Sequence, residues 1–286
     1  MQQPFLGVVI HLMTDDKVKK ITEKIQTMSK YRDVEIPIET IRSLVEQSLP
    51  LSKNSADLEK RVREKIHNIV ALYLGDLDYE KAKHEFRQIK NSPEEIKAFA
   101  QRGLTCHAST KERGQELTEL YKKLFDRLGE VKSIADLACG IHPLGLPFMG
   151  LPSNIAYYAY DLNKVRADFI NTFITEQGYE GGCFHQDILI NPPTMRFDTA
   201  FFFKEAQRFE KRQPGALPDF LDSINAAKVV VSLPLQSLGN RLQLFTKYEK
   251  ILGEYSEACG WVLDDFSFGN EVFYIIDRCG VDNDYI

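Results

Sequence analysis

The chain has few cysteines, and they form no familiar pattern. Its 286 residues include five, which are Cys106, Cys139, Cys183, Cys259 and Cys279. Their number is odd and none stands in C-x-x-C spacing, so the sequence argues against a disulfide framework and against a zinc or other metal site. Scattered thiols are typical of a reducing compartment, and we expect a cytoplasmic protein.

The apolar stretch near the N-terminus, PFLGVVIHL at residues 4–12, is too short to span a membrane. It also lacks the basic flank and the small-residue cleavage site of a signal peptide. Met13 then opens MTDDKVKK, which has the character of a natural start. We expect residues 1–13 to be a leader or a disordered extension, with an ordinary ordered segment as the alternative.

No part of the chain is strongly basic. Residues 1–130 hold 23 basic and 21 acidic residues, whereas residues 131–286 hold 13 and 20. The clearest excess lies in residues 17–65, with 12 basic and 8 acidic side chains. This excess is mild for a nucleic-acid-binding surface, and on charge alone a solvated helical face explains it better.

The N-terminal half has a helical pattern. Apolar residues recur at three- and four-residue spacing, as at Val18, Ile21 and Ile25. The segments with this spacing are 13–28, 38–49, 57–75, 78–90, 92–103 and 112–129. Residues 14–128 are therefore predicted to be all-α.

After Gly129 short apolar runs alternate with helical segments, which predicts a mainly parallel sheet with crossover helices. The predicted strands are 133–139, 156–161, 181–187, 198–203, 228–234, 261–268 and 272–278. The last two are so close in sequence that they should form an antiparallel hairpin. A seven-stranded Rossmann-like α/β sheet with a terminal hairpin resembles class I S-adenosylmethionine-dependent methyltransferases, here preceded by an all-α domain.

Polar residues stand where the predicted strands end, the edge at which doubly wound sheets bind ligands. Asp136 closes the apolar run of the first strand and Gly140 follows it, Asp161 ends the second, Asp187 ends the third, and Lys204 ends the fourth. Asp161 is placed for the hydroxyls of a ribose, and Asp187 for an adenine amino group. Any one of these aspartates could instead be a helix cap or turn residue. A nicotinamide cofactor is less favoured, because the fuller glycine fingerprint is missing.

Before the first strand stands HASTKER, residues 107–113. Its residues Ser109 to Glu112 fit S-x-x-E, the capping box that begins a helix. Local sequence alone leaves open whether His107, Thr110 and Arg113 have only a structural role or face a ligand.

Five motifs together resemble one known family. They are HASTKER, DLACGIHPLGLPFMGLP at 136–152, YDLN at 160–163, VVVSLPLQSLGNR at 229–241 and GNEVFYII at 269–276. In this combination they are similar to the 16S rRNA guanine-N7 methyltransferases of aminoglycoside resistance, the Arm/Rmt group and its actinomycete relatives. The similarity covers about residues 28–278.

The resemblance implies an enzyme that transfers a methyl group from S-adenosyl-L-methionine to N7 of a guanine in the decoding-site helix of 16S rRNA. The substrate would be the 30S subunit, and the modification would give aminoglycoside resistance. The resemblance also implies an α-helical docking domain at residues 14–106 and a cofactor-binding methyltransferase domain at residues 107–286. The asymmetric ribosomal target favours a monomer.

The matching family positions imply the site residues. Around the cofactor they are Tyr73, His107, Thr110, Arg113, Ala138, Gly140, Asp161, Leu162, Asp187 and Ile188. Near the target base they are Lys204, Ser237 and Arg241, and no residue is expected to act as a general base. Arg113 would pair with the methionine carboxylate of the cofactor. The candidates for rRNA phosphates are Lys17, Lys20, Arg32, Arg61, Arg63 and Lys65.

Some positions depart from the family pattern. His142 replaces the usual Asn, Gln236 replaces a common Lys, and Glu205 to Arg208 replace a segment that usually begins with Leu-Pro. These changes leave two alternatives open. One is a methyltransferase for a different RNA, protein or small molecule, with the helical module as a lid. The other is an RNA-binding protein that binds S-adenosylmethionine but has little activity.

Overall fold

The computed structural model describes residues 16–27, 35–70, 77–89, 92–106, 110, 113, 116–152, 154–235 and 242–279. The chain divides into two compact units. The smaller consists of Met1–Gly75 and Leu162–Val165, and the larger of Asp76–Asp161 and Arg166–Ile286. None of the helices in the described ranges combines the length and apolar character that a bilayer crossing needs.

The smaller unit is helical, as its apolar spacing predicts. It contains a helix at 16–26, α3 (Ile38–Ser48), the short 3₁₀ helix η1 (Leu49–Leu51) and α4 (Ser55–Val70). The start of α4 is fixed by Asn54, whose side chain accepts a hydrogen bond from the backbone N–H of Asp57 at 2.9 Å. The core is a cluster of buried apolar residues on the facing sides of these helices, including Val18, Ile25, Leu44, Val62 and Ile66.

The larger unit is built on one seven-stranded sheet. Its strands are β1 (Ser133–Leu137), β2 (Ala156–Asp161), β3 (Glu180–His185), β4 (Phe197–Phe203), β5 (Ala226–Pro234), β6 (Val262–Phe268) and β7 (Glu271–Asp277). They are ordered β3-β2-β1-β4-β5-β7-β6. The first five are parallel, and β7 is antiparallel to both β5 and β6. All seven predicted strands and the terminal hairpin are confirmed.

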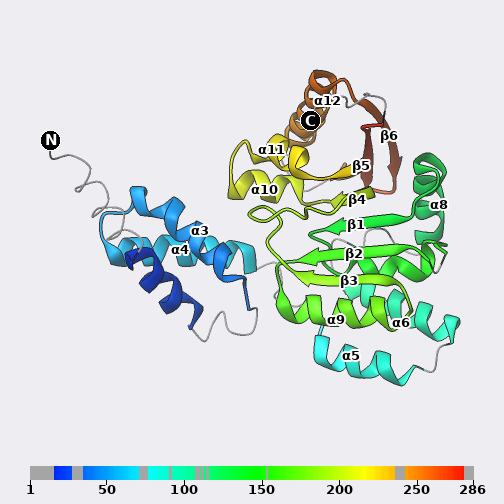
Figure 1. Cartoon of the computed structure of the whole chain (residues 1–286), viewed down its shortest axis with the longest axis horizontal. Coiled ribbons are helices and arrows are strands. Elements are labelled where there is room, and N and C mark those ends of the chain that lie inside the picture. Colours follow the sequence, from blue (N-terminus) through cyan, green and yellow to red (C-terminus); the bar gives the residue numbers. More distant parts are fainter. Residues whose placement is uncertain are drawn as a thin grey trace. The chain divides into compact units, whose positions relative to one another are not determined.

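Helices cover both faces of this sheet (Figure 1). On one face lie α10 (Ala206–Arg212), α11 (Ala216–Ser223) and α12 (Leu242–Cys259), which share one apolar cluster with the sheet. On the other face α8 (Leu117–Leu128) packs Phe125 against Phe201 of β4 at 6.3 Å between ring centroids. Phe201 and its neighbour Phe202 pack on opposite faces of the sheet, because side chains alternate along a strand.

A second helical layer lies beyond α9 (Lys164–Thr175). The ring of Phe173 in α9 packs against Phe86 of α5 (Tyr79–Gln88) and Phe99 of α6 (Pro93–Cys106). The distances between ring centroids are 4.8 Å and 6.2 Å. Helices α5 and α6 therefore belong to the larger unit, whereas the predicted docking domain extends to residue 106. The division of roles between docking and catalysis stays a prediction.

Candidate cofactor and substrate site

The carboxyl ends of β1 and β4 carry strained backbone. Ala138, after β1, has φ 53°, and Lys204, after β4, has φ 59°. Both values lie in the left-handed region, which is costly for residues with a Cβ and which clusters at functional sites. Lys204 is held there by its backbone N–H, which donates to the carbonyl and the hydroxyl of Ser232 at 3.1 and 3.2 Å. The strand order reverses between β1 and β4, which is where sheets of this kind bind ligands.

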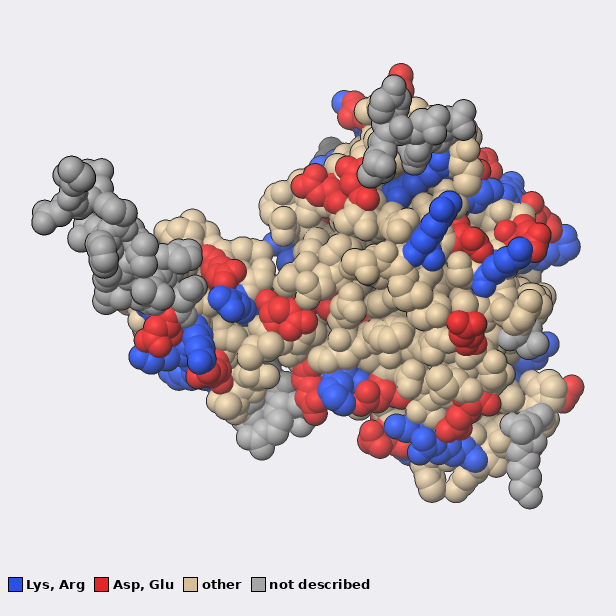
Figure 2. All heavy atoms as spheres, in the orientation of Figure 1, with Lys and Arg blue, Asp and Glu red and all other residues tan. Residues whose placement is uncertain are grey.

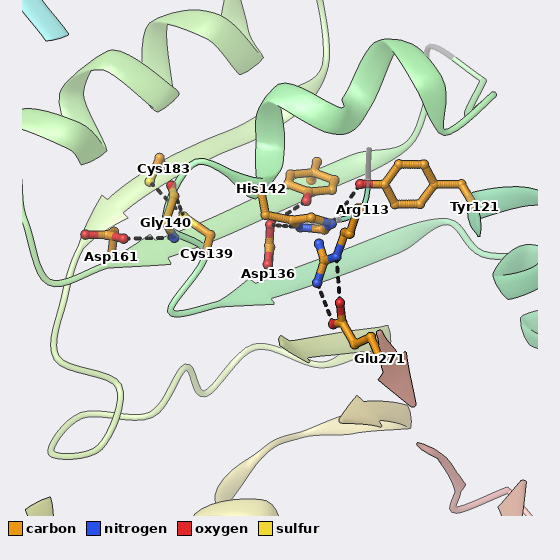
Figure 3. A network of polar contacts seen from close by, with 10 residues as sticks. Arg113, Tyr121, Asp136, Cys139, Gly140, His142, Asp161, Cys183 and Glu271 are labelled. Carbon is orange, nitrogen blue, oxygen red and sulfur yellow. Dashed lines mark hydrogen bonds and ion pairs between the residues drawn. The ribbon is translucent and has the colours of Figure 1, made fainter. Parts of the chain in front are cut away.

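Gly140 ties the loop after β1 to the end of β2 (Figure 3). Its backbone N–H donates to Asp161 Oδ2 at 3.0 Å, and its φ of 55° favours glycine. A Cβ at Gly140 would lie 3.4 Å from Nη1 of Arg166, so little room is left. Arg166 Nε in turn lies 3.6 Å from Asp161 Oδ1. The Asp161 carboxylate is thus held at the open edge by a backbone donor and a buried cation.

A buried charge cluster joins HASTKER to the last strand of the sheet. Arg113 donates twice to Glu271, from Nε at 3.1 Å and from Nη2 at 2.8 Å, and both side chains are at most 5% exposed (Figure 3). Lys204 Nζ lies 3.3 Å from the same carboxylate. The guanidinium of Arg113 also stands over the ring of Phe203, 4.9 Å from its centroid.

Two cations therefore share one buried carboxylate. Burial alone would raise the pKa of Glu271, but the charge and hydrogen bonds of Arg113, together with Lys204, hold it below its ordinary value. Burial would likewise lower the pKa of Arg113, and the attraction of Glu271 raises it instead. Arg113 and Glu271 are thus both held in their charged forms, where the carboxyl end of β4 meets the first residue of β7.

His142 forms part of a buried hydrogen-bond chain beneath the loop after β1. Its Nδ1 lies 2.7 Å from Asp136 Oδ2, and its Nε2 lies 3.0 Å from the hydroxyl of Tyr121. Tyr157 donates to the same Asp136 oxygen at 2.6 Å. Burial, with Asp136 nearby, raises the pKa of the Tyr157 hydroxyl well above its ordinary value. His142, a departure from the family pattern, thus supports the loop from below.

Asp187 is buried after β3 and is held by α10. Arg212 donates to both of its oxygens, with Nη1 2.9 Å from Oδ1 and Nη2 bonded to Oδ2. The backbone N–H of Leu189 also donates to Oδ1, at 3.2 Å. Ile188 packs beside it in the apolar cluster under α10 to α12.

Glu205 begins α10 directly after Lys204. Its side chain is 14% exposed and pairs with Arg208. Burial raises the pKa of Glu205 to about 7, Arg208 and Arg166 oppose the shift, and the negative charge of Asp161 adds to it. Glu205 is therefore a carboxyl group poised near neutrality on the β4 side of the strand reversal.

The structure brings several of the predicted cofactor residues to one edge of the sheet. Ala138, Gly140 and Asp161 meet there, Asp187 and Ile188 follow β3, and Lys204 and Arg113 meet at Glu271. Two predicted residues make other contacts. The Thr110 hydroxyl donates to the carbonyl of Leu104 at 2.5 Å, and Leu162 packs against the apolar cluster of the smaller unit.

Several predicted residues lie outside the described part of the chain. They are Tyr73, His107, Ser109, Glu112, Ser237, Arg241 and Arg32. Helix α8 begins at Leu117 with Glu116 in the N-cap position, so a capping box at Ser109 would not start that helix. The roles of all these residues stay predictions.

Glu271, Arg166 and Arg212 are partners of the predicted residues that the sequence alone does not reveal. Glu271 stands in GNEVFYII, and the only signal available was a charged residue at the start of an otherwise apolar strand. Arg166 and Arg212 lie on helices among other charged residues, where nothing in the spacing distinguishes them.

The predicted phosphate contacts lie on the helices of the smaller unit. Lys17 and Arg63 are exposed, Lys20 pairs with Asp16 at 2.7 Å, and Arg61 pairs with Asp57 at 3.1 Å. Burial and the charge of Arg61 lower the pKa of Lys65. On the face shown in Figure 2, basic and acidic side chains are interspersed, in agreement with the mild excess of charge.

The described residues contain no candidate metal site. Among them, no group of three or more His, Cys, Asp or Glu side chains is arranged to hold a metal ion. The charged groups of the site are instead paired with one another.

Comparison with known proteins places the chain in a family. A curated 16S rRNA (guanine(1405)-N(7))-methyltransferase from Frankia casuarinae is 27% identical over 271 residues, covering 92% of this chain and 95% of the relative. The structure of the 16S rRNA methylase RmtB has a TM-score of 0.72 at 24% identity, covering 91% of this chain and 98% of that one. The 16S rRNA methyltransferase RmtF, solved in complex with S-adenosyl-L-homocysteine, has a TM-score of 0.72 at 22% identity, covering 92% and 98%. The family model described as ribosomal RNA methyltransferase (FmrO) matches residues 27–275, and the chain belongs to that family.

Proposed function

We propose that this enzyme transfers the methyl group of S-adenosyl-L-methionine to N7 of a guanine in 16S rRNA, at the position named 1405 in its relatives. The family match over residues 27–275 carries this proposal. The edge of the sheet at β1, β2 and β4 agrees with it, because strained backbone and a fixed carboxylate lie at the strand reversal. Methylation at this position gives aminoglycoside resistance as its consequence.

The residues present at the edge fit this cofactor. The N–H of Gly140 holds Asp161 in place at the end of β2, where its carboxylate can accept hydrogen bonds from ribose hydroxyls. Glycine at position 140 permits the positive φ that aims its N–H at Asp161 and leaves room for the guanidinium of Arg166 behind it. Arg113, whose guanidinium is also paired with Glu271, would contact the carboxylate of a methionyl group.

The chemistry asks little of the protein beyond positioning. When bound, the cofactor supplies a methyl group on a positively charged sulfur, which is a good leaving group. Guanine N7 carries a lone pair at neutral pH, so no side chain has to remove a proton. The residues of the site instead hold the two reactants in line at near-contact distance and keep water out. A guanine in a stacked helix must also leave the stack, and Lys204, which follows β4, is the residue that we propose to hold it.

We further propose that the substrate is the 30S subunit and that the helices of the smaller unit dock on it as part of a monomeric enzyme. The exposed Lys17 and Arg63 support this assignment as candidates for rRNA phosphates. The same unit acting as a lid over a small substrate is the competing possibility.

The test is transfer of labelled methyl from S-adenosylmethionine to purified 30S subunits and, in parallel, to naked 16S rRNA, with the modified base mapped. Label at one decoding-site guanine N7, in 30S subunits only, is the expected result. Label on both substrates would remove the docking role of the smaller unit. No label on either, with S-adenosylmethionine still bound, would refute the rRNA substrate and favour a methyltransferase with another target.

A further inference from the structure

The segment that begins α10 differs from the family pattern and brings a carboxyl group into the site. Glu205 follows Lys204 directly, on the β4 side of the point where the strand order reverses. The loop with Ala138 and Gly140 lies on the β1 side of that point, and Asp161 lies one strand further along. Glu205 and Asp161 thus flank the end of β1 from its two neighbouring strands.

The positions of Asp161 and Glu205 indicate how the cofactor would lie along the carboxyl ends of the strands. A nucleoside whose ribose lies on Asp161 has its adenine toward β3 and its sulfur toward β1 and β4, because ligands of doubly wound sheets cross the strand reversal. The sulfur would then lie on the side of the site where Glu205 stands. The substrate carries a positive charge on that sulfur and the product, S-adenosylhomocysteine, carries none.

We propose that Glu205 is a specificity-determining residue whose carboxylate favours the cationic methyl donor over the neutral product. The inference rests on the proposed function and deepens it. The Glu205 side chain is only 14% exposed and is close enough to Asp161 and Arg166 for their charges to act on it, so its own charge acts strongly on this side of the site. A preference for the donor would limit inhibition by the product.

The charges around Glu205 set how its ionisation responds to the ligand. Arg208 on its own helix and Arg166 on α9 favour the carboxylate, whereas Asp161 on β2 and burial disfavour it, which gives a pKa of about 7. A bound sulfonium adds a further cation and favours ionisation. Binding of the donor should therefore strengthen as the pH rises through 7, relative to binding of the product.

The experiment compares the affinity of the full chain for S-adenosylmethionine and S-adenosylhomocysteine by calorimetry, at pH 6 and pH 8. Glu205→Gln removes the charge and keeps the shape. Glu205→Leu is a second variant, with the residue that the family usually has after the lysine. Glu210→Gln is the matched control, because it makes the same change on the same helix, where Glu210 accepts from the backbone of Gly215 and Leu217.

The expected result is a loss of about tenfold in affinity for the donor at pH 8, with affinity for the product nearly unchanged, in both Glu205 variants. The Glu210 control should keep the wild-type ratio. The inference would be overturned if both Glu205 variants kept the wild-type ratio of affinities for the donor and the product. An equal loss of affinity for both ligands would overturn it too, because a change of shape, unlike a loss of charge, weakens both ligands equally. If wild type binds neither ligand, the proposed function itself fails.

Discussion

The ion pair between Arg113 and Glu271 predicts how strongly each of three substitutions should lower the stability of the protein. Removing one partner of a buried pair costs about 3–5 kcal/mol, because the other charge stays buried without compensation. Glu271→Gln would leave Arg113 and Lys204 together without their shared anion, and we expect a cost near the top of that range. Arg113→Met would leave Glu271 with Lys204, whose Nζ lies 3.3 Å away, and we expect about 2–3 kcal/mol.

The double variant provides the sharpest check. With both partners gone, only Lys204 remains, and its side chain is already 12% exposed. The free energy of unfolding of the double variant should therefore be higher than that of Glu271→Gln alone. The measurement is urea unfolding followed by circular dichroism. Because the pKa of Glu271 is held below its ordinary 4.5, the stabilisation by the pair is present above pH 4.5 and is lost as the pH falls further.

Two outcomes would refute this reasoning. One is an Arg113→Met variant that costs as much as Glu271→Gln, since the remaining lysine would then have no effect. The other is a double variant whose cost equals the sum of the single costs. Calorimetry with S-adenosylhomocysteine on the folded variants separates this structural role of Arg113 from its predicted role in holding the cofactor.

Three further predictions concern other parts of the molecule. Because the pKa of Glu205 is raised to about 7, its ionisation lowers the free energy of unfolding as the pH rises from its ordinary pKa of 4.5 to 7, and the full loss persists above pH 7. Glu205→Gln should therefore be more stable than wild type by about 1–3 kcal/mol at pH 8 and equal to it below pH 4, which unfolding curves at the two pH values will check. His142→Ala leaves the Tyr121 hydroxyl and Asp136 without their shared partner and should cost about 2–4 kcal/mol, with His142→Asn costing less; equal costs would contradict the hydrogen-bond chain. Reversing the charge of Lys17 and Arg63 together should lower methylation of 30S subunits about tenfold at low salt without changing affinity for S-adenosylhomocysteine, and loss of both would indicate misfolding.

The strands and their ends could be predicted because their pattern is local. Buried parallel strands are short apolar runs, and the residue that closes each run marks the ligand-binding edge. The positions of Asp161, Asp187 and Lys204 at strand ends are therefore visible in the sequence, whereas their roles toward a ligand stay predictions. The family motifs added Arg113, which no spacing would have singled out.

The partners of these residues could not be predicted, because they come from distant parts of the chain. Arg113 and Glu271 are 158 positions apart, and a sequence does not say which buried carboxylate meets which cation. The residue at which the smaller unit ends could not be predicted from the sequence either. Helices α5 and α6 have the same amphipathic spacing as α4, and it is their tertiary packing, such as that of Phe86 and Phe99 on Phe173, that assigns them to the larger unit.

The position of β7 has a consequence for the newly made protein. This strand is the last of the seven to be synthesised, yet it lies inside the sheet, between β5 and β6. A nascent chain that ends before residue 271 has the Arg113 side chain and Lys204 but no Glu271 to join them. The buried ion cluster of Arg113, Lys204 and Glu271 therefore cannot form until β7 has emerged from the ribosome.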